Sequence, residues 1–445
     1  MDFPGLLTSI GDFAYTAGAF VVALSIIVAV HEYGHYIVGR WSGIHAEVFS
    51  LGFGPVLWSR MDRRGTRWQI AAVPFGGYVK FLGDANAASA GADTTTMSRL
   101  SDEERRHTMH GAPLWARAAT VFAGPAFNFV LSVLVFGAML FVSGVATDAP
   151  EIEALRPLPV ESGLMPGDRI LSVAGYETPD YKALGEVAEK LPGDALIDYR
   201  VLRDGQEVTV TGPTLIPALV LAVLPKSAAM DAGLREGDVI LAMNGKPTPR
   251  FDDLQAIVKE SGGAPITLRV WRDGTEFETK LAPRERPVTV EGGGLETGYQ
   301  IGISGSFMFD PATRRPGVGE ALEAGVRQTW GIIETTFSAL SSMVAGKIST
   351  CNLNGPVGMA QATGAAASAG LSSFVWLIAA LSTAIGLLNL FPIPVLDGGH
   401  LVFHAYEWAR GKPPSDGFMN AAMAVGLTLV LALMLFGLTN DLFCR

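Results

Sequence analysis

The chain opens with an apolar stretch that ends in a cluster of ionisable side chains, His31-Glu32-Tyr33-Gly34-His35. No residue of Phe13–Val30 is charged, and with the residues around it this stretch can cross a membrane as a helix. Residues four apart share a helix face, so His31 and His35 can both contact one metal ion, with Glu32 beside them as a general base. Because ionisable groups at membrane depth are costly, a functional metal site is favoured over a chance match.

Composition also points to a membrane protein. Of the 445 residues, 49% are hydrophobic and only 17% are charged, whereas a soluble protein carries about 25% charged residues. The net charge of −10 argues against nucleic acid as a partner. The two cysteines, Cys351 and Cys444, are too few for a zinc cluster or a disulfide framework.

Four stretches are apolar and long enough to span a bilayer, which makes the lipid bilayer an expected partner. We place these transmembrane segments at residues 1–40, 114–147, 371–400 and 418–445. Basic residues concentrate in the segments 41–113 and 401–417, while the N-terminal tail has none. By the positive-inside rule, these two loops lie in the cytoplasm, and both termini and the long segment 148–370 lie outside. Cys351 and Cys444 would then share the oxidising side, and whether they pair stays open.

The long outer segment contains an internal repeat. Ser162–Leu171 recurs as Ala232–Leu241, roughly 70 residues later, and each copy is followed by an Arg-Asp-Gly turn typical of a hairpin. The shared pattern G-L-x-x-G-D-x-I resembles PDZ domains of the bacterial protease type, which bind extended peptides at a sheet edge. This resemblance implies two tandem α+β PDZ domains at 148–214 and 215–285, which either bind peptides or serve as spacers and steric gates.

Residues 286–370 are expected to hold a linker and an amphipathic helix. Pro283–Pro316 is rich in glycine and proline, which is typical of a linker. Beyond it, Val326, Trp330, Ile333 and Phe337 recur at helical spacing and form one apolar face. This face can lie on the membrane surface or pack against the spans, and packing is the interpretation we favour.

A third metal ligand must come from another span at the same depth, because a catalytic zinc usually has three protein ligands and one open position. Asp397 is the only acidic residue between Lys347 and Glu407, and it lies at the cytoplasmic end of the third span, where the first span also ends. Gly398 and Gly399 allow a sharp turn that points the carboxylate back. We therefore expect Asp397 to bind the metal rather than to cap a turn.

The run from Asn389 to Gly398 reads N-L-F-P-I-P-V-L-D-G. Together with H-E-x-x-H in the first span, it resembles the site-2 protease family of intramembrane zinc metalloproteases. The resemblance implies Zn²⁺ as cofactor on His31, His35 and Asp397, catalysis by Glu32, and a substrate-holding or oxyanion-holding role for Asn389. Pro392 and Pro394 support this resemblance, because they interrupt the hydrogen bonding of a helix. Irregular backbone at membrane depth is tolerated only where it lines a cavity, so these prolines predict a cavity beside the metal.

Residues 41–113 are expected to form a β-hairpin and a mobile loop. Gly52 and Gly54 permit close backbone approach, and a free strand edge can accept an extended substrate. Members of the family place such a hairpin re-entering the membrane near the metal, which we favour over an ordinary cytoplasmic hairpin. Two further residues are expected to support the site from behind the ligands: Asn128 in the second span and His400 after the Asp-Gly-Gly turn.

The predicted fold is therefore an α-helical polytopic membrane protein with four transmembrane helices, a re-entrant hairpin and two PDZ domains in the extracytoplasmic loop. The predicted function is zinc-dependent intramembrane proteolysis in a bacterial inner membrane, with the active site near the cytoplasmic side. By resemblance, its partners are single-pass membrane proteins of the anti-sigma factor type and signal peptide remnants. The main rival is a non-catalytic membrane adaptor that binds peptides through its PDZ domains. A third interpretation, a metal-handling protein, predicts further ligands along the spans, and the sequence has none evident.

Overall fold

The computed structural model describes residues 3–85, 91–191, 196–289 and 294–444. The chain divides into two compact units. We call them the helical unit (Met1–Met139, Val318–Phe337 and Leu353–Arg445) and the sheet unit (Leu140–Gly317 and Ser338–Asn352).

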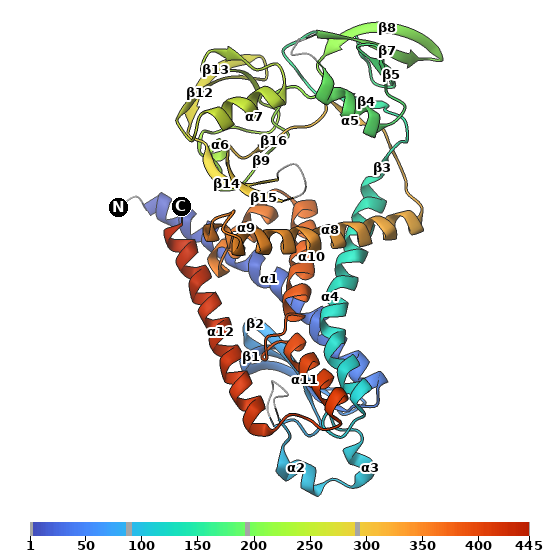
Figure 1. The fold of residues 1–445 in the computed structure, drawn as a ribbon, viewed down its shortest axis with the longest axis vertical. Coiled ribbons are helices and arrows are strands. Elements are labelled where there is room, and N and C mark those ends of the chain that lie inside the picture. Colours follow the sequence, from blue (N-terminus) through green and yellow to red (C-terminus); the bar gives the residue numbers. More distant parts are fainter. Residues whose placement is uncertain (1–2, 86–90, 192–195, 290–293, 445) are drawn as a thin grey trace. The chain divides into compact units, whose positions relative to one another are not determined.

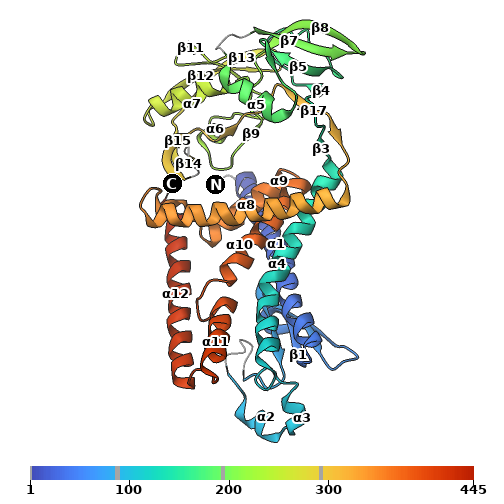
Figure 2. The same ribbon diagram turned by 45° about the vertical axis from the view of Figure 1, so that its right-hand side comes forward.

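Long helices and one β-hairpin make up most of the helical unit (Figures 1 and 2). Its elements are α1 (Phe3–Trp41), β1 (Ala46–Met61), β2 (Arg67–Phe81), α2 (Thr94–Arg99), α3 (Asp102–Arg105), α4 (Leu114–Ser143), α8 (Val318–Val344), α9 (Pro356–Ser368), α10 (Leu371–Asn389), α11 (Asp397–Arg410) and α12 (Asp416–Phe443).

Four helices in the described part of the chain are long and apolar enough to cross a membrane. They are α1 from Gly11 onward, α4, α10 and α12 from Gly417 onward, and each overlaps one of the four stretches expected from the sequence. Many large apolar side chains of α12 are exposed, among them Leu427, Leu431 and Leu435. Such a face suits contact with lipid, where burial inside the protein is not needed.

Small residues let the helices of this unit approach closely. A Cβ atom added to Gly34 of α1 would lie 2.5 Å from the carbonyl oxygen of Ala123 in α4. Likewise, a Cβ atom at Gly325 of α8 would lie 2.3 Å from the carbonyl oxygen of Val133 in α4. Larger side chains would separate these backbones, so the packing follows the small-residue contacts common between membrane helices.

The expected third span is interrupted, and the expected cytoplasmic loop 401–417 is mostly helical. Helix α10 ends at Asn389, and α11 begins at Asp397 and continues to Arg410. The break contains Pro392 and Pro394, which have no N–H to continue the helical ladder. A new helix can start directly after them, and this start carries Asp397.

Strands β1 and β2 form the expected antiparallel hairpin. Its turn is closed by Asp62, whose carboxylate accepts hydrogen bonds from the backbone N–H of Arg64 and Thr66 at 2.8 and 3.0 Å. Pairing shifts register around Gly52 and Gly54, both with positive φ, which bends the hairpin there. Apolar side chains on this part of the hairpin are exposed, including Phe53, Val56, Leu57, Trp58, Val73 and Phe75.

The stretch expected to be a mobile loop is only partly described, because residues 86–90 lie outside the described ranges. Downstream of them, the short helices α2 and α3 directly follow Asp93 and Ser101, whose side chains cap the first backbone N–H groups. Capping of this kind accounts for local helix in a segment whose polar composition favoured a loop.

The sheet unit holds most of the strands. Its elements are β3 (Val145–Ala146), β4 (Ile152–Leu155), β5 (Arg169–Val173), β6 (Tyr176–Glu177), α5 (Tyr181–Lys190), β7 (Leu196–Arg203), β8 (Gln206–Pro213), β9 (Ala222–Val223), α6 (Ala228–Asp231), β10 (Val239–Met243), β11 (Lys246–Pro247), α7 (Phe251–Glu260), β12 (Ile266–Arg272), β13 (Thr275–Leu281), β14 (Arg284–Thr289), β15 (Leu295–Gln300), β16 (Ile303–Ser304), β17 (Phe309–Pro311), β18 (Thr313–Arg314) and the 3₁₀ turn Thr350–Asn352.

The two copies of the sequence repeat fold alike. The first has the strand order β6-β5-β7-β8 and the second β11-β10-β12-β13, and each contains one 10-residue helix, α5 or α7. Matching ion pairs also recur: Arg203 binds the buried Asp168, and Arg272 binds the buried Asp238. The repeat therefore encodes two α+β domains, each with its own apolar core.

The segment expected to be a plain linker, Pro283–Pro316, instead forms strands. Strands β16, β17 and β18 pair with β9, β4 and β3 respectively, and β14 pairs with β15. Met308 and Phe309 are buried in the core of the first domain, while Ile301 is buried in the second. Glycine and proline suggested a linker, but the apolar residues between them complete the two cores.

Helix α8 appears where the sequence predicted one, with a different packed face. Its buried residues are small or polar, namely Ala321, Gly325, Thr329 and Ser342, and the backbones of Ala321 and Gly325 lie against α4. The expected apolar face is largely exposed, since Trp330 and Phe337 are 59% and 50% exposed. The packing interpretation is therefore wrong for this face, because close contact with α4 selects small residues. In both views α8 runs crosswise to α4 and α12 (Figures 1 and 2).

Candidate metal centre and its cavity

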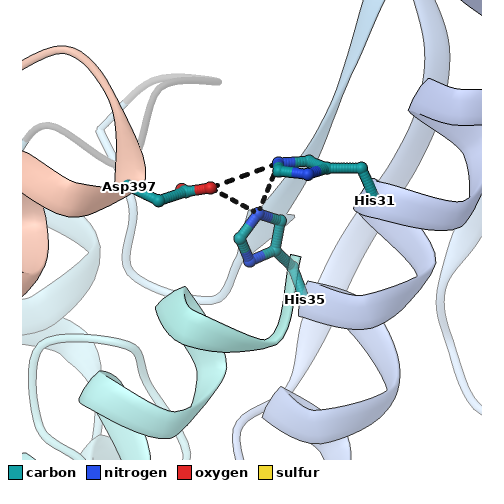
Figure 3. A group of neighbouring side chains, drawn as sticks. All are labelled: His31, His35 and Asp397. Carbon is teal, nitrogen blue, oxygen red and sulfur yellow. Dashed lines mark hydrogen bonds and ion pairs between the residues drawn. The ribbon is translucent and has the colours of Figure 1, made fainter. Parts of the chain in front are cut away.

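Three potential metal ligands from two helices converge in the helical unit (Figure 3). His31 and His35 lie one turn apart on α1, and Asp397 is the first residue of α11. The Nε2 atoms of the two histidines are 3.2 Å apart. Asp397 Oδ2 lies 3.2 Å from His31 Nε2 and 3.5 Å from His35 Nε2.

This arrangement fits a tetrahedral divalent cation. A tetrahedral zinc ion bound at about 2.0–2.2 Å holds its ligand atoms roughly 3.4 Å apart, which is close to the observed separations. Two imidazole nitrogens and one carboxylate oxygen are also a usual donor set for zinc with one position left open. In the described part of the chain, Asp397 Oδ2 is buried and accepts no well-aligned hydrogen bond, as expected of an atom that serves a cation.

Helix α4 orients both histidines. The backbone carbonyl of Thr120 lies 2.8 Å from His35 Nδ1 and can only accept, so Nδ1 carries a proton and Nε2 is the nitrogen that can give its lone pair to a metal. The side-chain amide of Asn128 lies 3.2 Å from His31 Nδ1. Between them, Gly124 makes room for the rings, since a Cβ atom there would lie 2.3 Å from His35 Nε2.

Two glycines place Asp397, although not by the sharp turn expected from the sequence. Added Cβ atoms would lie 2.3 Å from the carbonyl oxygen of Leu390 at Gly398, and 2.4 Å from that of Ile393 at Gly399. Neither glycine is among the residues with positive φ. The glycines are therefore needed because the irregular segment after α10 folds back against the start of α11.

Glu32 and the three ligands line one cavity of about 670 Å³. A Cβ atom at Gly77 of β2 would lie 3.0 Å from Glu32 Cγ and 2.7 Å from the carbonyl oxygen of Ser50, so this strand runs directly against the carboxylate side chain. Asn389 and His400 also line the cavity. The hairpin thus brings an extended backbone to the same cavity as the candidate general base.

Other residues singled out from the sequence lie elsewhere. Among the described residues that line the cavity, β2 contributes Gly77, Tyr78, Val79 and Phe81, whereas Gly52 and Gly54 are not included. Pro392 and Pro394 belong to the irregular segment, which lines the cavity through its following residues Val395 and Leu396. Pro394 instead packs against Gly426 of α12.

A second cluster of polar side chains in the cavity was not expected from the sequence. Arg117 of α4 donates two hydrogen bonds, of 2.6 and 3.0 Å, to Glu407 of α11, and this ion pair is mostly buried. His404 lies next to it, where burial and the Arg117 cation lower the pKa of its imidazole to about 4. These residues are scattered over 290 positions of the chain, so no local pattern could have grouped them.

Comparison with known proteins agrees with this geometry. The model of peptidase family M50 matches residues 19–433. The protein Atu1380 of Agrobacterium fabrum, named as a zinc metalloprotease, is 37% identical over 95% of this chain and 94% of its own length. The regulator of sigma-E protease RseP of Escherichia coli is 31% identical over 97% of this chain and 99% of its own length.

Among solved structures, a PDZ domain of Listeria monocytogenes covers 20% of this chain with 16% identity and a TM-score of 0.16, which is too slight a likeness to carry an argument. The family match spans nearly the whole chain and includes both motifs at the candidate metal centre. The chain therefore belongs to peptidase family M50, the site-2 protease family that its paired motifs resemble.

Proposed function

We propose that this protein is a zinc-dependent endopeptidase that cleaves transmembrane segments of other proteins. The observation that carries the proposal is the convergence of His31, His35 and Asp397 beside Glu32, in one cavity between apolar helices. The relatives named as zinc metalloproteases support zinc as the cofactor. A protein that handles metal ions would need further clusters of metal ligands along the helices. Within the described part of the chain, His31, His35 and Asp397 form the only such cluster, which favours the protease.

Zinc would be held by the Nε2 atoms of His31 and His35 and by the carboxylate of Asp397. When bound, zinc supplies a Lewis acid that polarises the peptide carbonyl and makes water more acidic. Glu32 then acts as the general base, since its carboxylate accepts a proton from the attacking water and passes it to the leaving amine. Asn389, at the cavity wall, would hold the substrate backbone or the developing oxyanion.

Substrate presentation would use the β-hairpin. A helical peptide bond is a poor substrate, because its carbonyl is hydrogen-bonded and shielded by side chains, so the segment must be held extended. The exposed apolar side chains near Phe53 and Trp58 suit a hairpin that re-enters the membrane. We propose that the bend at Gly52 and Gly54 aims a strand edge at the substrate, and that Pro392 and Pro394 keep the facing wall irregular.

The location and natural substrates rest on the relatives. We propose a multi-pass protein of a bacterial inner membrane, with both termini and the sheet unit outside and the active site near the cytoplasmic side. Two relatives, from Salmonella typhimurium and Escherichia coli, carry the name regulator of sigma-E protease RseP, which supports anti-sigma factors as substrates. Signal peptide remnants are the second proposed substrate class. The two α+β domains would act as PDZ-type binders or as a size filter against untrimmed substrates.

The direct test replaces Glu32 with glutamine. Glu32→Gln should bind as much zinc as the wild type, because Glu32 is not among the three ligands. Cleavage of a tagged single-pass membrane substrate should fall by about 10²–10⁴-fold, the usual contribution of a general base. Glu323→Gln on the exposed face of α8 is the matched control and should change neither quantity. Undiminished cleavage by Glu32→Gln would remove Glu32 from the mechanism, and a wild type without any cleavage would favour a peptide-binding adaptor.

A further inference from the structure

The geometry points to a specific positioning role for Asn128 of α4. We propose that, in the metal-loaded protein, its side-chain amide oxygen accepts a hydrogen bond from Nδ1–H of His31. This bond keeps the lone pair of His31 Nε2 available for the metal. The inference rests on the proposed function, because it concerns the protein with its ion bound.

Asn128 is fully buried, and its amide contacts the histidine ring from behind the metal centre. The atom assigned as Nδ2 lies 3.2 Å from His31 Nδ1, while the atom assigned as Oδ1 is buried without a hydrogen-bond partner in the described part of the chain. Half a turn about the last side-chain bond exchanges the two positions and moves no other group. Geometry alone therefore allows either the amide nitrogen or the amide oxygen to face His31.

The chemistry of imidazole decides between the two orientations. A neutral imidazole has one N–H, so a ring that gives the Nε2 lone pair to a metal carries its proton on Nδ1. Only an acceptor can face that Nδ1–H, so Asn128 must present its oxygen. His35 already has this arrangement, with Nδ1 opposite the backbone carbonyl of Thr120. Helix α4 would thus orient both ligands, through a main-chain oxygen in one case and a side-chain oxygen in the other.

Helix α10 holds Asn128 in place from the other side. The hydroxyl of Ser382 on α10 donates a hydrogen bond to the backbone carbonyl of Asn128 at 3.0 Å, and Ser132 of α4 itself donates to the same carbonyl at 3.0 Å. Gly386 of α10 leaves just enough room, since a Cβ atom there would lie 3.0 Å from Asn128 Cβ. The amide can therefore turn over, but its distance from His31 is set by three packed helices.

The test compares three variants of the full-length protein purified in detergent. Asn128→Leu keeps the volume but has no acceptor, whereas Asn128→Asp keeps an acceptor at the same distance. Thr383→Val is the matched control: it removes a buried hydrogen bond within α10 and leaves both hydrogen bonds to the Asn128 carbonyl in place. For each variant, zinc affinity is measured by competition with a chelating dye, and the visible spectrum of the Co²⁺-loaded protein reports ligand geometry.

We expect Asn128→Leu to bind zinc about 10–100-fold more weakly than the wild type, the usual cost of losing a partner behind a metal ligand. Its Co²⁺ spectrum should shift as well. Asn128→Asp and Thr383→Val should stay within about threefold of the wild type and keep the spectrum. Wild-type affinity in Asn128→Leu would overturn the inference, and so would equal losses in all three variants, which would indicate a general packing role.

A measurement on the wild type avoids any folding defect of the variants. The chain has seven histidines, so ¹⁵N-histidine NMR of the zinc-loaded protein can resolve the ring nitrogens, with His31→Gln used for assignment. The inference requires a protonated Nδ1 on His31, and a protonated Nε2 would overturn it. If His31→Gln binds zinc as tightly as the wild type, the proposed metal centre itself fails; if only Asn128→Leu is neutral, this inference alone fails.

Discussion

Carboxylates with buried oxygen atoms occur in both units, but their surroundings differ. In the sheet unit, Asp238 is fully buried, and it accepts hydrogen bonds from Arg272 at 2.6 and 2.7 Å and from the backbone N–H of Arg235 at 2.8 Å. Asp168 repeats this arrangement with Arg203 and Met165. In the helical unit, Asp397 instead faces two histidine nitrogens, and its Oδ2 accepts no hydrogen bond from the described residues.

The difference separates structural charges from functional ones. A buried carboxylate whose oxygens all have donors holds a fold together, and removing it leaves an arginine without its partner. A buried carboxylate left short of donors is costly to fold, so its presence indicates a ligand or a reaction. Asp238 and Asp397 therefore make a matched pair, in which the same Asp→Asn change should damage different properties.

The largest expected effect is on the helical side of this comparison. Asp397→Asn replaces a charged ligand with a neutral amide, so zinc per protein should fall well below one and cleavage should drop by about 10³-fold or more. Metal analysis and cleavage of a membrane substrate measure both, while thermal unfolding should change little. A variant that keeps its zinc would show that the third ligand has been wrongly assigned.

Asp238→Asn should have the opposite profile. Losing a charge-assisted pair of hydrogen bonds should destabilise the second α+β domain by about 2–4 kcal/mol. The asparagine amide has only one oxygen, so it cannot accept both hydrogen bonds that Arg272 donates. Hydrogen exchange of β10 and β12 in the full-length protein should then rise by about two orders of magnitude. Zinc content should stay at the wild-type value, and loss of zinc in this variant would erase the distinction between the two carboxylates.

A smaller effect is expected at the ion pair between Arg117 and Glu407, which joins α4 to the helix that begins with Asp397. Both carboxylate oxygens of Glu407 accept a hydrogen bond from Arg117, as both oxygens of Asp238 do from Arg272. We therefore expect the pair to be structural and to affect the metal site only by holding α11 in place. Glu407→Gln should lower cleavage about tenfold, and the exchange Arg117→Glu with Glu407→Arg should recover part of it. An exchange that recovers nothing would mean that the pair acts by its individual charges.

The smallest effect is expected for an exposed ion pair between β12 and β13, in the same α+β domain as Asp238. Arg269 and Glu276 lie 3.8 Å apart with both side chains more than half exposed. Water and salt screen such a pair, so Glu276→Ala should change hydrogen exchange of β12 by no more than about threefold. A large change here would show that burial is not what distinguishes Asp238.

Local patterns were enough to find much of this architecture. Hydropathy located the four apolar helices, and the four-residue spacing put His31 and His35 on one face, because both signals act within a few turns of a single helix. The sequence repeat around Asp168 and Asp238 predicted two similar domains. Predictions from composition were wrong where packing dominates. The few apolar residues of Pro283–Pro316 complete two cores, although the segment looked like a linker. Helix α8 packs through Gly325 rather than through its apolar face.

Which groups face the histidines is decided only by the packed chain. Thr120 and Asn128 stand 85 and 97 positions from the rings that they contact, and nothing near His31 or His35 encodes which side of α4 will meet α1. The side of α4 that faces α1 is set by the close approach of the two helices at Gly34 and Gly124. Any side chain at these positions would collide with a backbone or with a histidine ring. The sequence identifies the residues that can bind a metal, because spacing and hydropathy act along single helices, whereas contact between the helices determines how each ligand is oriented.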